Sequence, residues 1–354
     1  MREKAHQLCR DFLRGAWEDI TPEELILKPI TGGLTNILYY CALPNSHTSK
    51  SKEPREIVLR IYGQTENEEC VQATLTDSVI FSILSERELG PRLFGMFPGG
   101  RLEEFIPSRT MKVTEMRDPQ YVQKIATNMA IFHSLDIPLT KEPTYVTNTM
   151  DKWVITYRDI LKSGTLKCEG IDNSKLEKLK NFNFEKEISY VMELVSKASS
   201  DVVFSHNDLQ EGNILINTVN NNNNDDNRIS VIDFEYCSYN YRAYDLANHF
   251  CEYRYDYTPP EHPYFTPCKD KYPTREQQLS FIRSYTKASK SAKNLDLNEE
   301  QILKDIKVFV LVSDLFWGLW AIVQSQTSTI PFGYMEWALE RIDDYHTDKE
   351  RLNN

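Results

Sequence analysis

The sequence predicts an α+β fold in two parts, a small antiparallel sheet with one main helix followed by a larger and mainly helical part. The first 107 residues contain five short stretches rich in β-branched and aromatic residues and one long amphipathic stretch. From about residue 117 onward, apolar residues recur at helical spacing. Hydrophobic residues make up 40% of the 354 residues, enough to bury a sizeable core. We therefore expect a sheet-rich domain over 1–107 and a helical domain over 108–354.

The strands of the first part are separated by glycine-containing turns. We expect two strands within 25–41 around a Gly-Gly turn, a third at 57–62, and two more around the turn at 98–100. A helix is expected over about 75–89, where a Gly-Pro pair ends it. Its buried stripe is expected to contain Leu75, Val79, Ile80, Ile83 and Leu84.

Helical patterns dominate the second part. Asp118 and Pro119 are typical of an N-cap and a first helical position. Further helices are expected at about 149–163, 185–199, 242–253, 274–289, 299–324 and 333–350. Two short strands, 214–216 and 229–232, flank an asparagine-rich loop. The most apolar stretch, 308–323, is shorter than the roughly 20 residues that cross a bilayer and contains Asp314, so it predicts a buried helix and no membrane span.

Charge and cysteine content limit the possible partners and the compartment. The formal net charge of −11 disfavours binding of nucleic acid through a general basic surface. Seven scattered cysteines without a C-x-x-C pair disfavour a disulfide framework and a structural zinc site. The first 20 residues lack the apolar run of a secretory signal. A reducing, cytoplasmic location fits these features.

The residues with the clearest chemistry lie around the two short strands of the second part. In the segments SHNDLQEGNILI and VIDFEY, Asp208 precedes one strand, Asn213 stands at its entrance and Asp233 follows the next. Phosphoryl transfer needs a carboxylate to accept the proton of the attacking hydroxyl and oxygen ligands that hold magnesium on the nucleotide phosphates. The spacing H-x-D-x-x-x-x-N, followed by a hydrophobic strand and Asp-Phe, matches this need. A turn capped by Asp208 and Asn213 is the alternative interpretation, but the match at Asp233 favours catalysis.

Seven segments along the chain form a distinctive set: GGLTN at 32–36, RIYG, ERELGPRLFG, GGRLEEFIPSR, HNDLQEGNILI, IDFEYCSYNYRAYDLANHFCE and FWGLWAIVQ at 316–324. Together they resemble the choline/ethanolamine kinase family. The resemblance extends over nearly the whole chain. It implies a two-lobed fold like that of protein kinases and ATP- and Mg²⁺-dependent phosphorylation of choline, and more weakly of ethanolamine. It also implies that Asp208 is the catalytic base, that Asn213 and Asp233 bind Mg²⁺, and that the protein is a homodimer.

The resemblance also implies the residues that contact ATP. Arg60 stands where protein kinases have a phosphate-binding lysine, Asp77 (or Glu86) would be its acidic partner, and Gln210 would lie beside the phosphates. The turn over the nucleotide would be Thr31, Gly32, Gly33, Leu34, Thr35, Asn36 and Ile37. Glu104, Phe105 and Ile106 would form the hinge near adenine, with Arg109 close behind.

Recognition of choline calls for aromatic faces and a negative field, because a quaternary ammonium ion has no N–H group to donate. Asp314, Trp317 and Trp320 fall on one stripe of the apolar helix. By resemblance the choline pocket consists of Tyr236, Glu252, Tyr257, Trp317, Trp320, Phe332 and Trp337, near Asp208. Residue 337 is commonly tyrosine in the family. Without the resemblance, tryptophans on such a helix would be interpreted as core.

Asp245 is expected to lie at the start of a helix and to brace the loop that contains Asp208 and Asn213, called the catalytic loop below. His249, Glu252 and Asp256 are expected on the same helical face, either facing a cationic substrate or simply exposed to solvent. Two alternative functions stay open at this point. One is an ethanolamine kinase, and the other is a catalytically silent kinase-fold scaffold, which the presence of Asp208, Asn213 and Asp233 disfavours. A protein kinase is disfavoured because no room is left after Asp233 for an activation segment.

Overall fold

The computed structural model describes residues 1–30, 36–62, 68–166, 171–218, 228–293 and 297–353. The chain divides into two compact units. The first contains residues 1–110 and 214–235, and the second contains residues 111–213 and 236–354. Relative to the expected boundary at 107, the first unit thus also includes residues 214–235, because a strand in this segment pairs with Ser108–Thr110.

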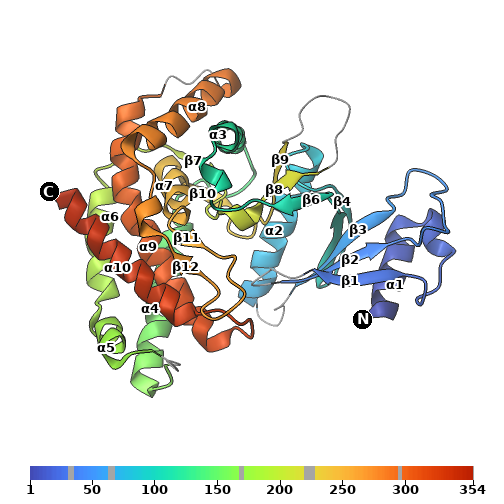
Figure 1. Ribbon diagram of the computed structural model, residues 1–354, viewed down its shortest axis with the longest axis horizontal. Coiled ribbons are helices and arrows are strands. Elements are labelled where there is room, and N and C mark those ends of the chain that lie inside the picture. Colours follow the sequence, from blue (N-terminus) through green and yellow to red (C-terminus); the bar gives the residue numbers. More distant parts are fainter. Residues whose placement is uncertain (31–35, 63–67, 167–170, 219–227, 294–296, 354) are drawn as a thin grey trace. The chain divides into compact units, whose positions relative to one another are not determined.

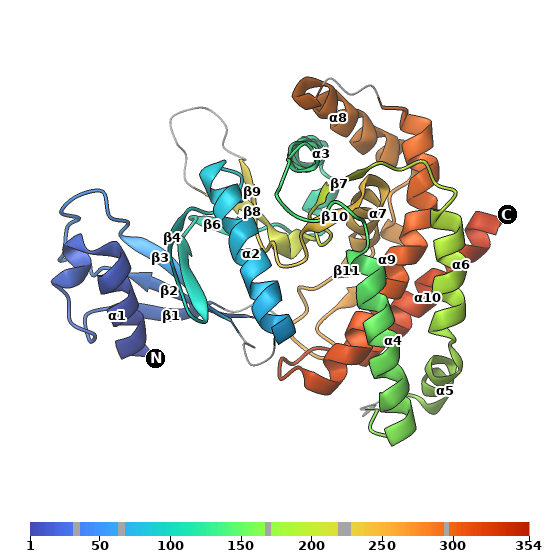
Figure 2. The same ribbon diagram turned by 180° about the vertical axis from the view of Figure 1, so that it is seen from behind.

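The first unit is built on a five-stranded antiparallel sheet of order β1-β2-β3-β5-β4. Helix α1 covers one face and α2 the other (Figures 1 and 2). A smaller sheet has the order β6-β8-β9. The elements are α1 (Arg2–Leu13), a 3-10 turn (Gly15–Glu18), β1 (Ile26–Ile30), β2 (Asn36–Ala42), β3 (Glu56–Tyr62), α2 (Glu68–Glu86), β4 (Leu93–Phe97), β5 (Gly100–Glu104), β6 (Ser108–Thr110), β8 (Ile214–Asn217) and β9 (Ile229–Val231).

The two faces of the large sheet differ in character. Ile57, Leu59 and Leu102 point to the α1 face, where they pack with Cys9, Trp17 and Cys41 in an apolar core. Because side chains alternate along a strand, Arg60, Arg101 and Glu103 point to the opposite face, toward α2. On α2, Ile80 and Leu84 are buried as predicted, but Leu75 and Val79 are 56% and 44% exposed. The predicted stripe was therefore too wide, because Leu75 and Val79 lie four residues apart on a different side of the helix from Ile80 and Leu84.

The second unit is mainly helical. Its elements are a 3-10 turn (Glu115–Arg117), α3 (Pro119–His133), α4 (Tyr145–Ser163), α5 (Asn173–Asn181), α6 (Phe184–Val195), β7 (Val202–Ser205), a 3-10 turn (Glu211–Asn213), β10 (Ser238–Tyr241), α7 (Arg242–Glu252), β11 (Tyr255–Asp256), β12 (Thr266–Pro267), a 3-10 turn (Lys269–Lys271), α8 (Arg275–Lys293), α9 (Glu299–Thr327) and α10 (Tyr334–Asn353). The predicted N-cap is confirmed, because the Asp118 carboxylate accepts a hydrogen bond from the backbone N–H of Gln120 at 3.0 Å, and Pro119 is the first helical residue.

Helix α9 is the core helix of this unit. It packs against α4, α6, α7, α8 and α10 (Figure 1). Its length and hydropathy would suffice for a membrane span, but 83% of its most apolar window is buried inside the protein. The prediction of a buried helix is therefore confirmed. The interior position of α9 also explains why Asp314, in the middle of this helix, is fully buried.

Candidate active site

Asp208 and Asn213 lie side by side in the second unit. Asp208 is in the loop after β7, and Asn213 ends a short 3-10 turn. The amide nitrogen of Asn213 donates to the carboxylate of Asp208 at 2.9 Å and to its backbone carbonyl at 2.8 Å. These two bonds fix the direction of the Asp208 carboxylate. They do not use the amide oxygen of Asn213.

Asp245, near the start of α7, holds the same loop in place. Its carboxylate accepts the backbone N–H of His206 at 2.9 Å and that of Asn207 at 2.8 Å, and contacts His133 Nε2 at 2.9 Å. Burial alone would raise the pKa of Asp245, but the contact with His133 and the other donors lower it overall. The predicted brace of the catalytic loop is therefore confirmed. It is needed because Asn207 adopts a left-handed backbone conformation, with φ of 65°.

Asp233 belongs to the first unit, where it follows β9. It too has a left-handed backbone, with φ of 66°, a conformation that costs free energy in a residue with a side chain. Its carboxylate lies 3.3 Å from Nη1 of Arg60, and its side chain is 27% exposed. Within this unit, strand β3 thus presents the predicted phosphate-binding arginine next to the predicted metal-binding aspartate.

Arg60 has a different main partner from the one predicted. Its Nε donates to Glu103 at 2.7 Å, and Arg101, directly across the strand pair, donates to the same oxygen at 2.8 Å. Asp77 forms its ion pair with Arg101. The prediction that Asp77 is the ion-pair partner of Arg60 is therefore wrong, because Glu103 is closer to Arg60 on the same sheet face. Burial would raise the pKa of Glu103, but the two guanidinium groups lower it overall.

The other residues predicted to contact nucleotide are only partly described. Thr31, Gly32, Gly33, Leu34 and Thr35 lie outside the described residues. At the start of β2, Asn36 donates to the Glu235 carboxylate at 3.4 Å, and Ile37 is 52% exposed. In the second unit, the side-chain amide oxygen of Gln210 accepts the backbone N–H of Gly212 at 2.6 Å.

The predicted hinge residues follow directly on β5. Glu104 closes that strand, and its carboxylate accepts the backbone N–H of Arg92 at 3.1 Å. The rings of Phe105 and Tyr40 pack edge to face, with their centroids 4.7 Å apart. The backbone carbonyl of Ile106 accepts a hydrogen bond from the Ser108 hydroxyl at 2.8 Å. Arg109 is exposed on β6. These residues stay predictions as nucleotide contacts.

The predicted choline-pocket residues come together in the second unit as one aromatic cluster. Trp317 is 5.2 Å from Tyr236 and 5.5 Å from Trp320, and Trp320 is 5.8 Å from Trp337, between ring centroids. Tyr257 lies 6.3 Å from Phe332 and 6.4 Å from Trp337. The indole N–H groups of Trp320 and Trp337 are buried without a hydrogen-bond partner in the part of the chain that is described.

Glu252 places a carboxylate against this cluster. Its Oε2 accepts the Tyr257 hydroxyl at 2.9 Å, and its Oε1 pairs with Arg341. The guanidinium of Arg341 lies 4.5 Å from the ring centroids of Tyr255 and Trp337. The cluster thus already accommodates one cation, which shows that its aromatic faces suit positive charge.

Helix α7 does not present a solvated stripe. All of its residues are buried, so the solvent-exposed interpretation of Asp245, His249 and Glu252 is wrong. Asp256 is in β11 and not on the helix, because α7 ends at Glu252. Burial lowers the pKa of His249 to about 4, so this ring is neutral near pH 7; its Nδ1 contacts the Leu209 carbonyl at 2.7 Å. His249 therefore helps to hold the catalytic loop in place through the backbone of Leu209.

Asn248 connects the catalytic loop to the aromatic cluster, although nothing in the sequence pattern had identified it. Its amide nitrogen donates to the Asn207 carbonyl at 3.1 Å, and its amide oxygen accepts the Trp317 indole N–H at 2.6 Å. The position of Asn248, three residues after Asp245 on α7, was the available signal. Glu103 could likewise have been noticed two residues after Arg101 on β5. Arg341 had no distinguishing local pattern.

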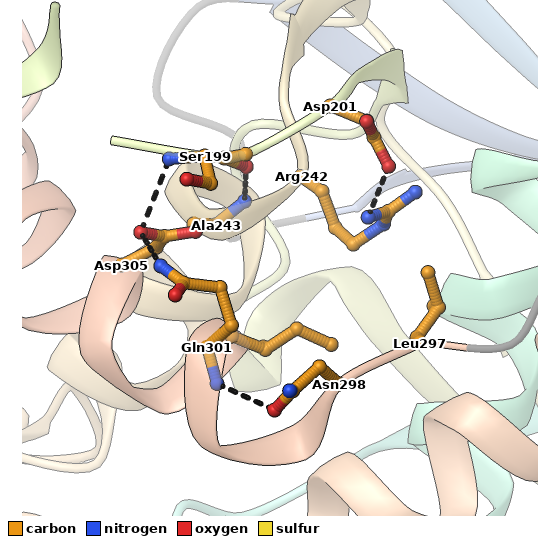
Figure 3. A pocket seen from close by; sticks show the side chains of 10 residues that line it. Ser199, Asp201, Arg242, Ala243, Leu297, Asn298, Gln301 and Asp305 are labelled. Atoms are coloured by element: carbon orange, nitrogen blue, oxygen red, sulfur yellow. Dashed lines mark hydrogen bonds and ion pairs between the residues drawn. The ribbon is translucent and has the colours of Figure 1, made fainter. Parts of the chain in front are cut away.

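A cavity of about 180 Å³ lies beside the N-terminal ends of α7 and α9 (Figure 3). Arg242 pairs with Asp201 at 2.8 Å, and the Asp305 carboxylate accepts the Gln301 amide at 2.8 Å and the Ser199 N–H at 3.3 Å. These polar groups bond to one another, so the cavity wall braces the start of α7. We assign it no ligand.

Asn213 in the second unit and Asp233 in the first each have an oxygen atom of the kind that suits a magnesium ion. The amide oxygen of Asn213 and the partly exposed carboxylate of Asp233 are hard ligands of the kind Mg²⁺ prefers. The described part of the chain contains no group of three or more His, Cys, Asp or Glu side chains that could hold a metal.

Known proteins resemble the chain over its full length. The sequence pattern described as choline/ethanolamine kinase matches residues 27–346. A human protein named choline/ethanolamine kinase is 42% identical, covering 99% of this chain and 87% of its own; mouse choline kinase alpha is 40% identical, with coverage of 99% and 81%. The crystal structure of a choline kinase from Cryptosporidium parvum is 26% identical and superposes with a TM-score of 0.76, covering 99% of this chain and 96% of its own. That likeness confirms the predicted kinase-like α+β fold, and the chain belongs to the choline/ethanolamine kinase family.

Proposed function

We propose that the protein phosphorylates choline with ATP, and ethanolamine more weakly, to give phosphocholine from choline. The observation that carries this proposal is that the carboxylate oriented by Asn213 is connected, through Asn207 and Asn248, to a cluster of aromatic rings containing a buried glutamate. This combination supplies a base for a hydroxyl group and a surface for a quaternary ammonium ion. The names of the family and of its relatives agree with both.

In the proposed reaction, Asp208 accepts the hydroxyl proton of choline while the alcohol oxygen attacks the γ-phosphorus and ADP departs. Asn213 holds the Asp208 carboxylate in place, and Asp245 holds the backbone of the loop. A fixed orientation lowers the entropic part of the barrier. Because Asp208 is already positioned, choline needs to bring only its hydroxyl group to the carboxylate.

Arg60 would bind phosphate, and Asn213 and Asp233 would hold Mg²⁺. When bound, the metal would neutralise the charge that develops on the phosphate oxygens. Gln210 would lie beside the phosphates, residues 31–37 would cover the nucleotide, and the segment 104–106 with Arg109 would border adenine. These roles are carried over from the family by position, and the Arg60–Asp233 contact of 3.3 Å supports the pairing of two of them.

The trimethylammonium group would lie against Tyr236, Trp317, Trp320, Phe332 and Trp337, with Glu252 and Tyr257 at the border. Aromatic faces attract a cation that has no N–H group, at about 0.5 to 2 kcal/mol each. Ethanolamine has three N–H donors, but the aromatic cluster consists mainly of rings, and the two oxygens of Glu252 already bond to Tyr257 and Arg341. We therefore expect choline to be the better substrate.

The test is a ³¹P NMR assay of purified protein with ATP, Mg²⁺ and a panel of amino alcohols. We expect phosphocholine with the wild type, and turnover reduced about a thousandfold in Asp208→Ala. Asp159→Ala, which removes an exposed carboxylate from α4, is the matched control. Full turnover by a folded Asp208→Ala protein, or a higher kcat/KM for ethanolamine than for choline, would contradict the proposal.

Location and assembly form a separate part of the proposal. The described cysteines at 9, 41, 237, 251 and 268 are free thiols, which supports a reducing, cytoplasmic location. We propose that the chain acts as a homodimer, as expected from the family. Light scattering during gel filtration would give twice the 41.3 kDa chain mass if this is correct.

A further inference from the structure

A buried ionic network lies next to the aromatic cluster, on α7, α9, α10 and the turn that follows α7. Arg254 pairs with Asp348 at 2.7 Å, with Asp344 at 3.4 Å and with Asp314 at 3.4 Å. Arg341 pairs with Asp314 at 3.4 Å and with Glu252. The side chains of these two arginines and four acids are at most 9% exposed. Charges in such a place affect one another strongly, because little water screens them.

Arg341 connects two of the acids. One terminal nitrogen contacts Glu252 and the other contacts Asp314, while the guanidinium rests on Tyr255 and Trp337. Its single positive charge is therefore shared between a carboxylate at the proposed choline pocket and a carboxylate within α9. How much of that charge offsets Glu252 depends on Asp314.

Asp314 is held loosely for a buried acid. Its Oδ1 makes both ion pairs at 3.4 Å, and its Oδ2 is buried with no hydrogen-bond partner among the described residues. No part of the proposed chemistry uses this residue. Such a group has room for a proton on the unpaired oxygen.

From this geometry we propose that Asp314 is a positioning residue for the substrate cation, acting through Arg341 on the carboxylate of Glu252. When Asp314 is ionised, its negative charge offsets part of the positive charge of Arg341, so the region around Glu252 is more negative. When Asp314 is protonated, the charge of Arg341 offsets that of Glu252 alone. This inference rests on the proposed function, since it takes the region beside Glu252 as the ammonium site.

The change falls near neutral pH, because burial and the neighbouring acids Asp348 and Asp344 raise the pKa of Asp314 to about 7 against the effect of Arg254 and Arg341. The other titratable groups that face it are Cys251, Tyr255, Tyr272 and Tyr345. Burial raises the pKa of Cys251 to about 12 and raises the pKa values of the three phenols further above their usual value. Choline itself has a fixed charge, so its binding reports the ionisation of the protein.

The experiment is calorimetric titration of the full chain with choline chloride between pH 6 and pH 8. In the wild type we expect the dissociation constant to fall about fivefold as pH rises through 7. Asp314→Asn should bind choline about fivefold more weakly at pH 8 and lose this pH dependence. Asp314→Glu, which retains a carboxylate, should restore it.

Asp348→Asn is the matched control, because it removes the same charge from the same network but contacts Arg254 and not Arg341. It should retain the pH dependence of choline binding, with a midpoint at lower pH, because Asp348 no longer raises the pKa of Asp314. A midpoint that stays at the wild-type pH in Asp348→Asn, or a wild-type dissociation constant that is the same at pH 6 and pH 8, would overturn the inference whether or not the Asp314 variants fold. Absence of choline binding by the wild type at every pH would instead contradict the proposed function.

Discussion

Arg60 donates from Nε to the carboxylate of Glu103 at 2.7 Å, and both side chains are buried between the five-stranded sheet and α2. The same carboxylate also accepts from Arg101. One glutamate therefore bonds to both buried guanidinium groups, and its loss would leave each with one acidic partner, Asp233 for Arg60 and Asp77 for Arg101. Glu103 therefore affects both the stability of the first unit and the orientation of Arg60, the proposed phosphate-binding residue.

We expect Glu103→Gln to lower the free energy of unfolding by about 3 kcal/mol, because removing one partner from a buried ion-pair network is costly. The KM for ATP should rise as Arg60 loses its anchor. Urea unfolding and steady-state kinetics measure the two effects. Glu23→Gln changes an exposed glutamate in the same unit and serves as the control. If the free energy of unfolding of Glu103→Gln equals that of the wild type, Asp77 and Asp233 are enough to balance the charges of both arginines.

Local patterns in the sequence were enough to predict most elements of the fold. The glycine turns, the Asp118 cap and the apolar periodicity of α9 all act over a few residues, so they predicted strands and helices whose bounds in the structure mostly differ by a few residues. The largest difference is at α2, which begins at Glu68 and not at about 75. The helices α1 and α5 and the strands β6, β7, β10, β11 and β12 were not predicted. These strands have at most four residues each, too few for a clear alternation of apolar and polar residues, and β7 and β10 pair with each other.

The partners of the charged residues could not be predicted in this way. Glu103 binds Arg60 because the register of β3 and β5 sets Arg60 opposite Arg101, and that register depends on packing of the whole sheet. Arg341 reaches Glu252 across 89 residues of sequence. Motif spacing identified the chemical groups Asp208 and Asn213 because they lie within one loop, whereas ion pairs between distant elements leave no local signature.

Asp245→Asn should slow turnover more than it weakens substrate binding. The carboxylate accepts two backbone N–H groups of the catalytic loop and contacts His133, and an amide can replace only part of this. We expect kcat to fall about a hundredfold with KM changed less than threefold, since a small misplacement of Asp208 affects the reaction and not the aromatic cluster. Steady-state kinetics checks this. An equal loss in Asp201→Asn, at the mostly exposed partner of Arg242, would contradict a specific role.

Asp245 also gives a prediction for pH. Because its pKa is lower in the folded protein than in the unfolded chain, the stability it contributes is present above the unfolded pKa of about 4 and is lost as pH falls toward the folded value. The difference in free energy of unfolding between the wild type and Asp245→Asn should therefore shrink on acidification below pH 4. Urea unfolding of both proteins at several pH values measures it. A difference that grows on acidification would contradict the assignment.

Trp317→Leu should weaken choline binding by about tenfold, as expected for the loss of one aromatic face at 1 to 2 kcal/mol. It also removes the indole N–H that Asn248 accepts at 2.6 Å, so kcat should fall modestly. Trp153→Leu is the control. Trp153, on α4, packs against Phe316, which precedes Trp317 on α9, but Trp153 is not part of the aromatic cluster. Equal effects of the two substitutions on the KM for choline would indicate loss of helix packing and not of a cation site.

Asp314 should make the protein less stable as pH rises toward neutrality, the opposite of Asp245. Its folded pKa of about 7 is above that of an unfolded aspartate, so the folded state binds the proton more tightly, and stability falls between about pH 4 and pH 7 by at most about 1.4 kcal/mol per pH unit. Asp314→Asn cannot ionise, so the wild type should lose stability relative to this variant across that range and differ by a constant amount above it. Paired urea unfolding at half-unit steps from pH 4.5 to pH 8 tests this sign. A difference that stays constant throughout would mean that Arg254 and Arg341 keep Asp314 ionised, and the neutral-pH change in choline binding would then have no source in this residue.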